Sequence, residues 1–199
     1  MKRSLSKAVL LLALGCTPFV HAQTPSQTPS VDYGRMTVQL NSTFVNAVQG
    51  LGAVITDLHG SPLQNNSFTF RAVAGALDLT TSAGEVEHTG GLLINADGPI
   101  IRIQNFTLDT SNPTSPVVTA EFIFNDRFIA RMALFNVHPP AGLTLPFQLQ
   151  AGVLQVNGLG LTLAPATASA LNTVLGGQYV QAGTSIGSAN TYVVFSPSN

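Results

Sequence analysis

The sequence predicts an all-β domain, mainly an antiparallel β-sandwich, that carries two short α-helices. Short runs of β-branched and aromatic residues recur along the chain with turn residues between them, which is a strand pattern. Charged residues make up only 9% of the chain, well below the usual quarter, as in many extracellular β proteins. Two stretches with apolar residues at helical spacing account for the helices.

The first 22 residues predict an export signal. Lys2, Arg3 and Lys7 precede an apolar run, and small or apolar residues stand before a cleavage site at Gln23. The run is too short to span a bilayer, which needs about 20 apolar residues. Cys16 leaves a second reading open, because the residues before it loosely resemble a lipoprotein box in which that cysteine becomes the lipid anchor.

Residues 23–35 predict a flexible tether, and residues 36–199 a single β-sandwich domain. The tether starts with QTPSQTPS, a tandem repeat of Pro and small polar residues that cannot build a core. Removal of residues 1–22 from the 199 leaves 177, which is enough for one self-sufficient core.

Two hairpins are well marked within the domain. Residues 95–99 and the pair Asn125-Asp126 contain residue types that tolerate the positive φ of tight turns. In the strand that follows the second turn, alternation places Phe128 and Leu134 on the face predicted to be core. The predicted strands are residues 36–40, 53–58, 67–74, 84–88, 92–95, 100–109, 117–124, 127–135, 147–155, 158–163 and 189–195.

Two strand–helix units, residues 38–52 and 161–177, share one pattern and indicate either a duplicated unit or a chance similarity. Pro165 suits the first position of the second helix, and Gly176 suits a left-handed stop. On this helix Leu171 belongs to an apolar stripe, whereas Thr167 and Asn172 lie away from it. We therefore expect Leu171→Ala to cost about 2–5 kcal/mol and Asn172→Ala under about 0.5 kcal/mol.

Charge and composition exclude several classes of function. After the signal the chain has no lysine and no cysteine, and five arginines face nine acidic residues, a formal charge of −4. Schiff-base and thiol catalysis, disulfides and thiolate metal sites are thereby excluded. Five scattered arginines do not supply the clustered cations that nucleic acids or anionic membranes require.

The densest cluster of titratable groups is Glu85, Glu87 and His88. In a strand the two carboxylates share one face and the imidazole points to the other. Exposed glutamates of this kind typically keep a sheet soluble. Two alternatives stay open, which are a cation site completed by Asp57 or His59 and acid–base catalysis by the two carboxylates.

The segment 183–187 matches the nucleophile motif G-x-S-x-G, but no acidic residue and no histidine follows it in the chain. Because the catalytic motif needs both later in the sequence, a Gly-rich turn is predicted here.

The segment 84–110, GEVEHTGGLLINADGPIIRIQNFTLDT, resembles the HtaA-type haem-binding domains of exported bacterial proteins. The strand phrase of that family reads roughly G-x-V-x-F-T-G-H-x-G-x-L. A later segment, ALNTVLGGQYVQAGTSIGSA, resembles a recurrent ending of uncharacterised secreted bacterial proteins. The residues that match the strand phrase are Gly84, Val86, Thr89, Gly90 and Leu92 or Leu93.

The resemblance implies an antiparallel β fold with two short helices. It places the histidine of the family at Gly91 and its tyrosine at Ala47 or Val48, so it does not carry a haem site over to this chain. No cofactor is predicted, and added haem should give no Soret shift typical of axial ligation.

The sequence thus predicts an exported, periplasmic or extracellular, non-enzymatic module that binds an unidentified ligand or serves a structural role in the envelope. The ligand-binding candidates are His59, Glu85, Glu87 and His88. One alternative is a haem or metal binder that uses His88 or His59 with Tyr33 or another tyrosine. A second alternative is a hydrolase that uses Glu85 and Glu87.

Overall fold

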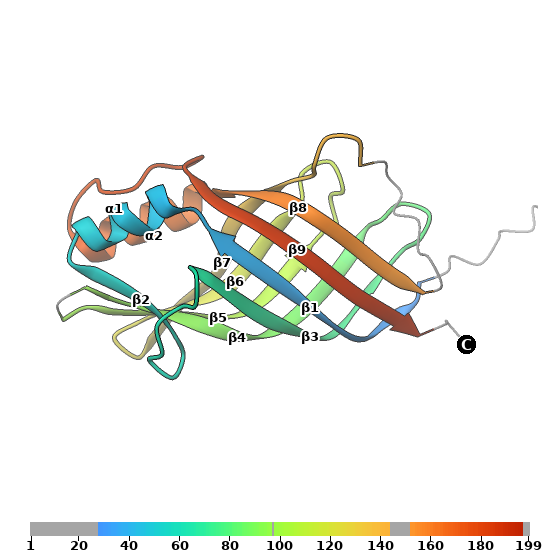
Figure 1. Cartoon of the computed structure of the whole chain (residues 1–199), viewed down its shortest axis with the longest axis horizontal. Helices are drawn as coiled ribbons and strands as arrows, with labels where there is room; N and C mark the ends of the chain where they lie inside the picture. The colour runs from blue at the N-terminus through green and yellow to red at the C-terminus, as the bar shows by residue number, and fades with distance from the viewer. Residues whose placement is uncertain (1–27, 97, 144–151, 197–199) are drawn as a thin grey trace, which may run out of the picture.

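The computed structural model describes residues 28–96, 98–143 and 152–196, which form nine strands and two helices (Figure 1). No helix in these ranges is long and apolar enough to cross a membrane. The helices are α1 (Ser42–Gly50) and α2 (Pro165–Leu175). The strands are β1 (Ser30–Leu40), β2 (Ala53–Asp57), β3 (Ser67–Leu77), β4 (Gly84–Ala96), β5 (Ile100–Asp109), β6 (Val117–Phe124), β7 (Arg127–His138), β8 (Val153–Leu163) and β9 (Ser185–Ser196).

Eight of the strands close into an antiparallel barrel. Paired neighbours follow the order β4-β3-β1-β9-β8-β7-β6-β5, and β5 pairs with β4 again, which closes the ring. The short β2 pairs with the second half of β4 and extends the sheet beyond the barrel. The fold is mostly antiparallel β with two helices, as predicted, but the predicted sandwich is wrong.

The physical reason is that alternation alone does not distinguish a sandwich from a barrel. Both architectures turn every second side chain inward. Closure depends on β1, which inserts between β3 and β9 and so joins strands from the two ends of the chain.

The barrel interior is a packed apolar core rather than a channel. Phe70 stacks on Phe106 with ring centroids 3.9 Å apart, and Phe68 meets Phe70 edge-on at 4.8 Å. Such contacts add to the stabilisation that burial itself provides. Other side chains almost completely buried here are Met36, Ile101, Phe122, Leu161 and Ile186.

Most of the local predictions are confirmed. β5 and β6 have the predicted bounds, and the turn between β6 and β7 places Asn125 at φ 46° and Asp126 at φ 61°. The predicted strands 84–88 and 92–95 are a single strand, because Gly90, at φ 108°, carries β4 through a bulge without ending it. β8 contains the predicted strand 158–163, and residues 147–151 of the predicted strand 147–155 lie outside the described residues.

Both helices lie at one end of the barrel (Figure 1). β1 and β8 flank β9 and run antiparallel to it, so both point the same way and each continues into its helix at that end. Asn41 caps α1 by accepting a hydrogen bond from the Phe44 N–H at 2.6 Å. Pro165 opens α2 and Gly176 closes it at φ 72°, as predicted.

Leu171 is 7% exposed and belongs to the core, as predicted, but two other expectations for α2 are wrong. Thr167 is fully buried, because α2 turns it toward β7, where its hydroxyl donates to the Ala133 carbonyl at 2.7 Å. Asn172 is half-buried and is held by hydrogen bonds to the chain that follows the helix.

Two further corrections concern β1 and β7. β1 begins at Ser30, so residues 30–35 of the predicted tether belong to the sheet. Phe128 is 63% exposed instead of buried. A bulge at Ile129 reverses the alternation of β7, so Phe128 pairs with Ile123 and points to the outer face of the sheet.

Candidate functional site

A groove lies between α1 and the connection from α2 to β9. Its volume is about 640 Å³, within the usual range of small-molecule pockets. One wall is α1, the other is formed by residues of the segment 178–185, and Leu163 also lines the groove. We call this hollow the α1 groove.

Asn172 shapes the second wall of the α1 groove. Its side-chain oxygen accepts hydrogen bonds from the N–H groups of Tyr179, at 2.8 Å, and Val180, at 3.0 Å. Its side-chain NH₂ donates to the Val180 carbonyl at 2.8 Å and to Gln178 Oε1 at 3.2 Å. One amide on a stable helix thereby fixes three consecutive residues of the connection.

Tyr179 has its ring packed against Gly177. A Cβ at Gly177 would lie 2.6 Å from the nearest ring carbon, so only glycine leaves room for this position of the ring. The ring remains 51% exposed and lines the α1 groove. An exposed aromatic ring on a backbone fixed by hydrogen bonds offers a large apolar contact area.

On the first wall, Asn41 ties the start of α1 to the opposite side of the groove. Its side-chain NH₂ donates to the Ser185 carbonyl at 2.9 Å and to the Ser185 hydroxyl at 3.3 Å. The groove therefore joins two segments that are more than a hundred residues apart in the chain.

All described side chains that line the α1 groove are uncharged. The apolar ones are Phe44, Ala47, Val48, Leu51, Leu163 and Val180. The polar ones are Asn41, Thr43, Gln178, Tyr179, Gln181, Thr184 and Ser185. The arrangement offers apolar contact and neutral hydrogen-bonding groups, but no cation or anion.

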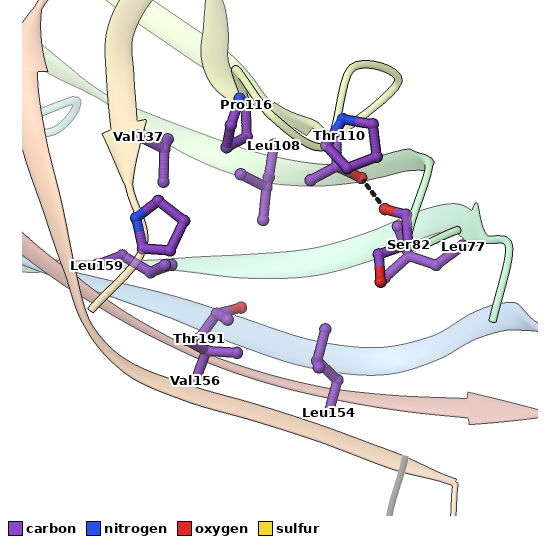
Figure 2. Close-up of a pocket in the computed structure, with 12 residues that line it drawn as sticks. Leu77, Ser82, Leu108, Thr110, Pro116, Val137, Leu154, Val156, Leu159 and Thr191 are labelled. Carbon is purple, nitrogen blue, oxygen red and sulfur yellow. Dashed lines mark hydrogen bonds between the residues drawn. The ribbon is translucent and has the colours of Figure 1, made fainter. Parts of the chain in front are cut away.

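A second cavity lies inside the barrel, at its other end, and is small (Figure 2). Its volume is about 30 Å³, which holds roughly two water molecules. The Thr110 hydroxyl donates to the Ser82 carbonyl at 2.8 Å beside it, and Thr191 contributes a buried hydroxyl without a partner among the described residues. The remaining lining is apolar, including Leu77, Leu108, Val137, Leu154, Val156 and Leu159.

The ligand-binding candidates predicted from the sequence do not come together in the structure. Glu85 and Glu87 are exposed on the outer face of β4, whereas His88 points inward and is 2% exposed. His59 is exposed in the turn after β2. Among the described residues, no three His, Cys, Asp or Glu side chains come together in a way that could hold a metal ion.

His88 is buried next to the aromatic core, opposite Phe106 on β5. Neither ring nitrogen meets the geometry of a hydrogen bond with any described group. Burial lowers the pKa of His88 to about 4, although the backbone groups of Val86 and Phe106 partly oppose that shift. The ring is therefore neutral near pH 7.

Asp57 shapes the turn that carries His59. Its carboxylate accepts hydrogen bonds from the N–H groups of Ser61 and His59, both at 2.8 Å. These bonds, the one from Ser61 foremost, lower the pKa of the Asp57 carboxyl. The same oxygen serves both bonds, so Asp57 has a structural role in this turn.

The positions to which the sequence resemblance assigns haem ligands carry none. Ala47 is exposed on α1, and Val48 is buried beside it. Gly91 lies so close to β5 that a Cβ there would collide with the Ile103 carbonyl oxygen. A histidine would need a different backbone path at this point.

The fold is that of a closed antiparallel barrel with two helices at one end, and the same fold is found in solved structures. The chain is similar to the C-terminal domain of HtaA from Corynebacterium glutamicum, with a TM-score of 0.66 at 15% identity over 84% of this chain and 99% of that one. It is also similar to the N-terminal domain of HtaA, with a TM-score of 0.57 at 15% identity over 83% of this chain and 98% of that one.

A domain-swapped dimer of a variant of the C-terminal domain matches with a TM-score of 0.53 at 14% identity, over 77% of this chain and 90% of that one. No protein-family model matches the sequence, and a search of curated proteins finds no match. The HtaA-like fold predicted from residues 84–110 is thus confirmed, and at this level of identity the likeness concerns the fold alone.

Sequence reasoning did not single out Tyr179 or the α1 groove. The available signal was the local sequence LNTVLGGQYV, in which an asparagine precedes two glycines and a tyrosine after a helix. Nothing in that pattern places it opposite α1, because the contact depends on the pairing of β1 and β8 with β9.

Proposed function

We propose that this chain is an exported, non-enzymatic binding module whose ligand is a small neutral molecule with a flat apolar part. The observation that carries this proposal is the α1 groove, about 640 Å³ in volume and lined by uncharged side chains around the exposed ring of Tyr179. Pockets of this size with mainly apolar walls and a few polar groups are typical ligand sites.

The absence of charge in the described lining favours a neutral ligand. A charged ligand would lose hydration on entering the groove and would find no opposite charge there to compensate it. A neutral ligand would place its flat apolar part against Tyr179 and Leu51, which are 51% and 42% exposed. Its polar edge would meet the amides and hydroxyls of the rim.

Haem, which the sequence resemblance makes the first alternative, does not fit the α1 groove. Its two propionates need cationic partners, and no Arg, Lys or His is among the lining residues. Tyr179 is the only described lining side chain of a type that ligates haem iron. His88 is enclosed by the barrel and cannot reach a ligand in the groove without opening the fold.

The proposal is tested with a neutral aromatic probe, N-phenyl-naphthylamine, whose fluorescence rises in apolar sites. Saturable binding is expected, with at least tenfold loss of affinity in Tyr179→Ala. Gly177→Ala should also weaken binding, because the added methyl displaces the Tyr179 ring. Tyr33→Ala is the matched control, since Tyr33 is also 51% exposed but does not line the groove. Equal binding by wild type and Tyr179→Ala would refute the proposal.

Haemin titration of the same variants separates the alternatives. We expect no Soret shift of the kind that axial ligation produces. Stoichiometric ligation abolished by His88→Ala would support the haem-binding alternative, and ligation abolished by Tyr179→Phe would make the α1 groove a haem site.

A further inference from the structure

We propose that the extension of the sheet at the end of the barrel that carries the helices, where β4 to β7 run beyond their neighbours, is the contact surface between two copies of this chain. The extension exists because its flanking strands end early. β3 pairs with β4 only as far as Thr89, and β8 pairs with β7 only from Phe135 onward. Past these points the sheet has a free edge on β7.

The free edge covers residues 127–132 of β7. Within the described part of the chain these residues pair with β6 on one side and with no strand on the other. The next two residues are covered by α2, because the carbonyls of Ala133 and Leu134 accept hydrogen bonds from Thr167 and Ala164. An uncovered edge is a template for another β-strand.

The outer face beside this edge carries several exposed apolar side chains. The strand registers place Leu93, Arg102, Ile123 and Phe128 in one row across four strands, and Val54, Asn95 and Ile100 in the next row on the same face. Phe128 is 63% exposed, Val54 54% and Ile100 41%, and Ile129 at the edge is 50% exposed.

These four residues are half of the eight large hydrophobic side chains that are exposed in the described part of the chain. They lie in neighbouring rows at one end of the sheet, with Asn95 and Arg102 between them, and such a group of exposed hydrophobic side chains indicates an interaction surface, whereas single ones are ordinary. We call Val54, Ile100, Phe128 and Ile129 the distal patch.

The chemistry of the patch favours a second copy as the partner. An antiparallel edge matches itself about a two-fold axis, so one surface supplies both sides of the contact. Each copy presents both signs of charge there, because Asp126 pairs with Arg102 at 2.8 Å and precedes Arg127 on the edge. Two copies can therefore pair Arg127 of one with Asp126 of the other.

The size of the distal patch determines how tightly two copies are expected to bind. Four half-exposed side chains offer roughly 400 Å² on each copy, about half of a standard interface, so the dimer should be weak. The bulge at Ile129, where β6 passes from Phe122 opposite Ala130 to Ile123 opposite Phe128, further limits the number of regular hydrogen bonds.

The test uses the chain from Gln23 onward, studied by sedimentation velocity across a concentration series up to about 0.5 mM, where a weak dimer is populated. Wild type should shift from monomer to dimer, and Phe128→Asp should raise the dissociation constant at least tenfold. Val73→Asp is the matched control, because Val73 is 44% exposed on β3 but lies outside the distal patch. Circular dichroism should show that both variants fold.

Disulfide trapping gives an independent measurement, since the chain from Gln23 onward has no cysteine. Ile129→Cys should form a cross-linked dimer under mild oxidation, and Val73→Cys should not. A monomer at all concentrations, or a dimer unaffected by Phe128→Asp, would overturn the proposal. Monomers that bind phosphatidylcholine vesicles through Phe128 would overturn it in favour of a lipid surface.

Discussion

His88 has a neutral imidazole buried next to the aromatic core, and neither ring nitrogen meets the geometry of a hydrogen bond with a described group. The folded state disfavours the protonated ring, and the pKa falls from the ordinary 6.5 to about 4. In the unfolded chain the ring takes up its proton at the ordinary pKa. At a pH between these two pKa values, the chain takes up a proton when it unfolds. The free energy of unfolding therefore falls as the pH falls from about 6.5 to about 4.

We expect this one group to remove about 3 kcal/mol of stability across that window, and nothing above it. The measurement is the urea midpoint at pH 7, 5 and 4. His88→Phe keeps a ring of similar size and removes the titration, so its midpoint should change less with pH. If wild type and His88→Phe lose stability in parallel, burial of His88 does not govern acid sensitivity.

Asn172 contributes more to stability than its position on the helix, away from the apolar stripe, predicts. Its side chain makes four hydrogen bonds that fix residues 178–180, so Asn172→Ala should cost about 1–3 kcal/mol instead of under 0.5. Ser169→Ala, on the exposed side of the same helix, is the control and should change stability by under about 0.5 kcal/mol. Thermal unfolding of both variants checks the difference, and equal small effects would contradict it.

At the scale of elements, α2 is held by its apolar side. Leu171 packs into the core, and Thr167 bonds to β7. Leu171→Ala leaves a cavity and should cost about 2–5 kcal/mol. The urea midpoint measures it, and a loss no larger than that of Ser169→Ala would show that α2 does not depend on this contact.

Element boundaries could be predicted wherever the signal is local. Asn125 and Asp126 define a turn by their own backbone preferences, and Pro165 and Gly176 define both ends of α2. Phe128 shows where local reasoning stops. Simple alternation from Leu134 places it in the core, but a bulge at Ile129 shifts the register against β6 and turns Phe128 to the outer face.

The candidate site could be predicted even less well than the fold. The sequence singled out titratable residues, of which the structure buries His88 and leaves Glu85 and Glu87 in solvent. The α1 groove arises only when β1 and β8 meet on either side of β9. Such long-range pairings leave no trace in the spacing of residues along the chain.

At the scale of the whole molecule, mass spectrometry can check the predicted cleavage of the export signal. The intact mass of the secreted protein should match a chain that begins at Gln23, because small or apolar residues precede that position in a signal-like segment. A mass that includes a diacylglyceryl group on Cys16 would contradict it. The protein would then be anchored to a membrane by lipid.

The position of β1 in the barrel has a consequence for when this protein can fold. Ser30 pairs with Ser196 and Gln39 with Ser188, so the ring closes only after the last strand has been synthesised. Contacts that join the two ends of a chain form late and slowly. A polypeptide still emerging from the ribosome therefore lacks the strand that completes its barrel. Late closure fits the export that residues 1–22 predict, because an incomplete barrel keeps the chain unfolded until it has crossed the membrane.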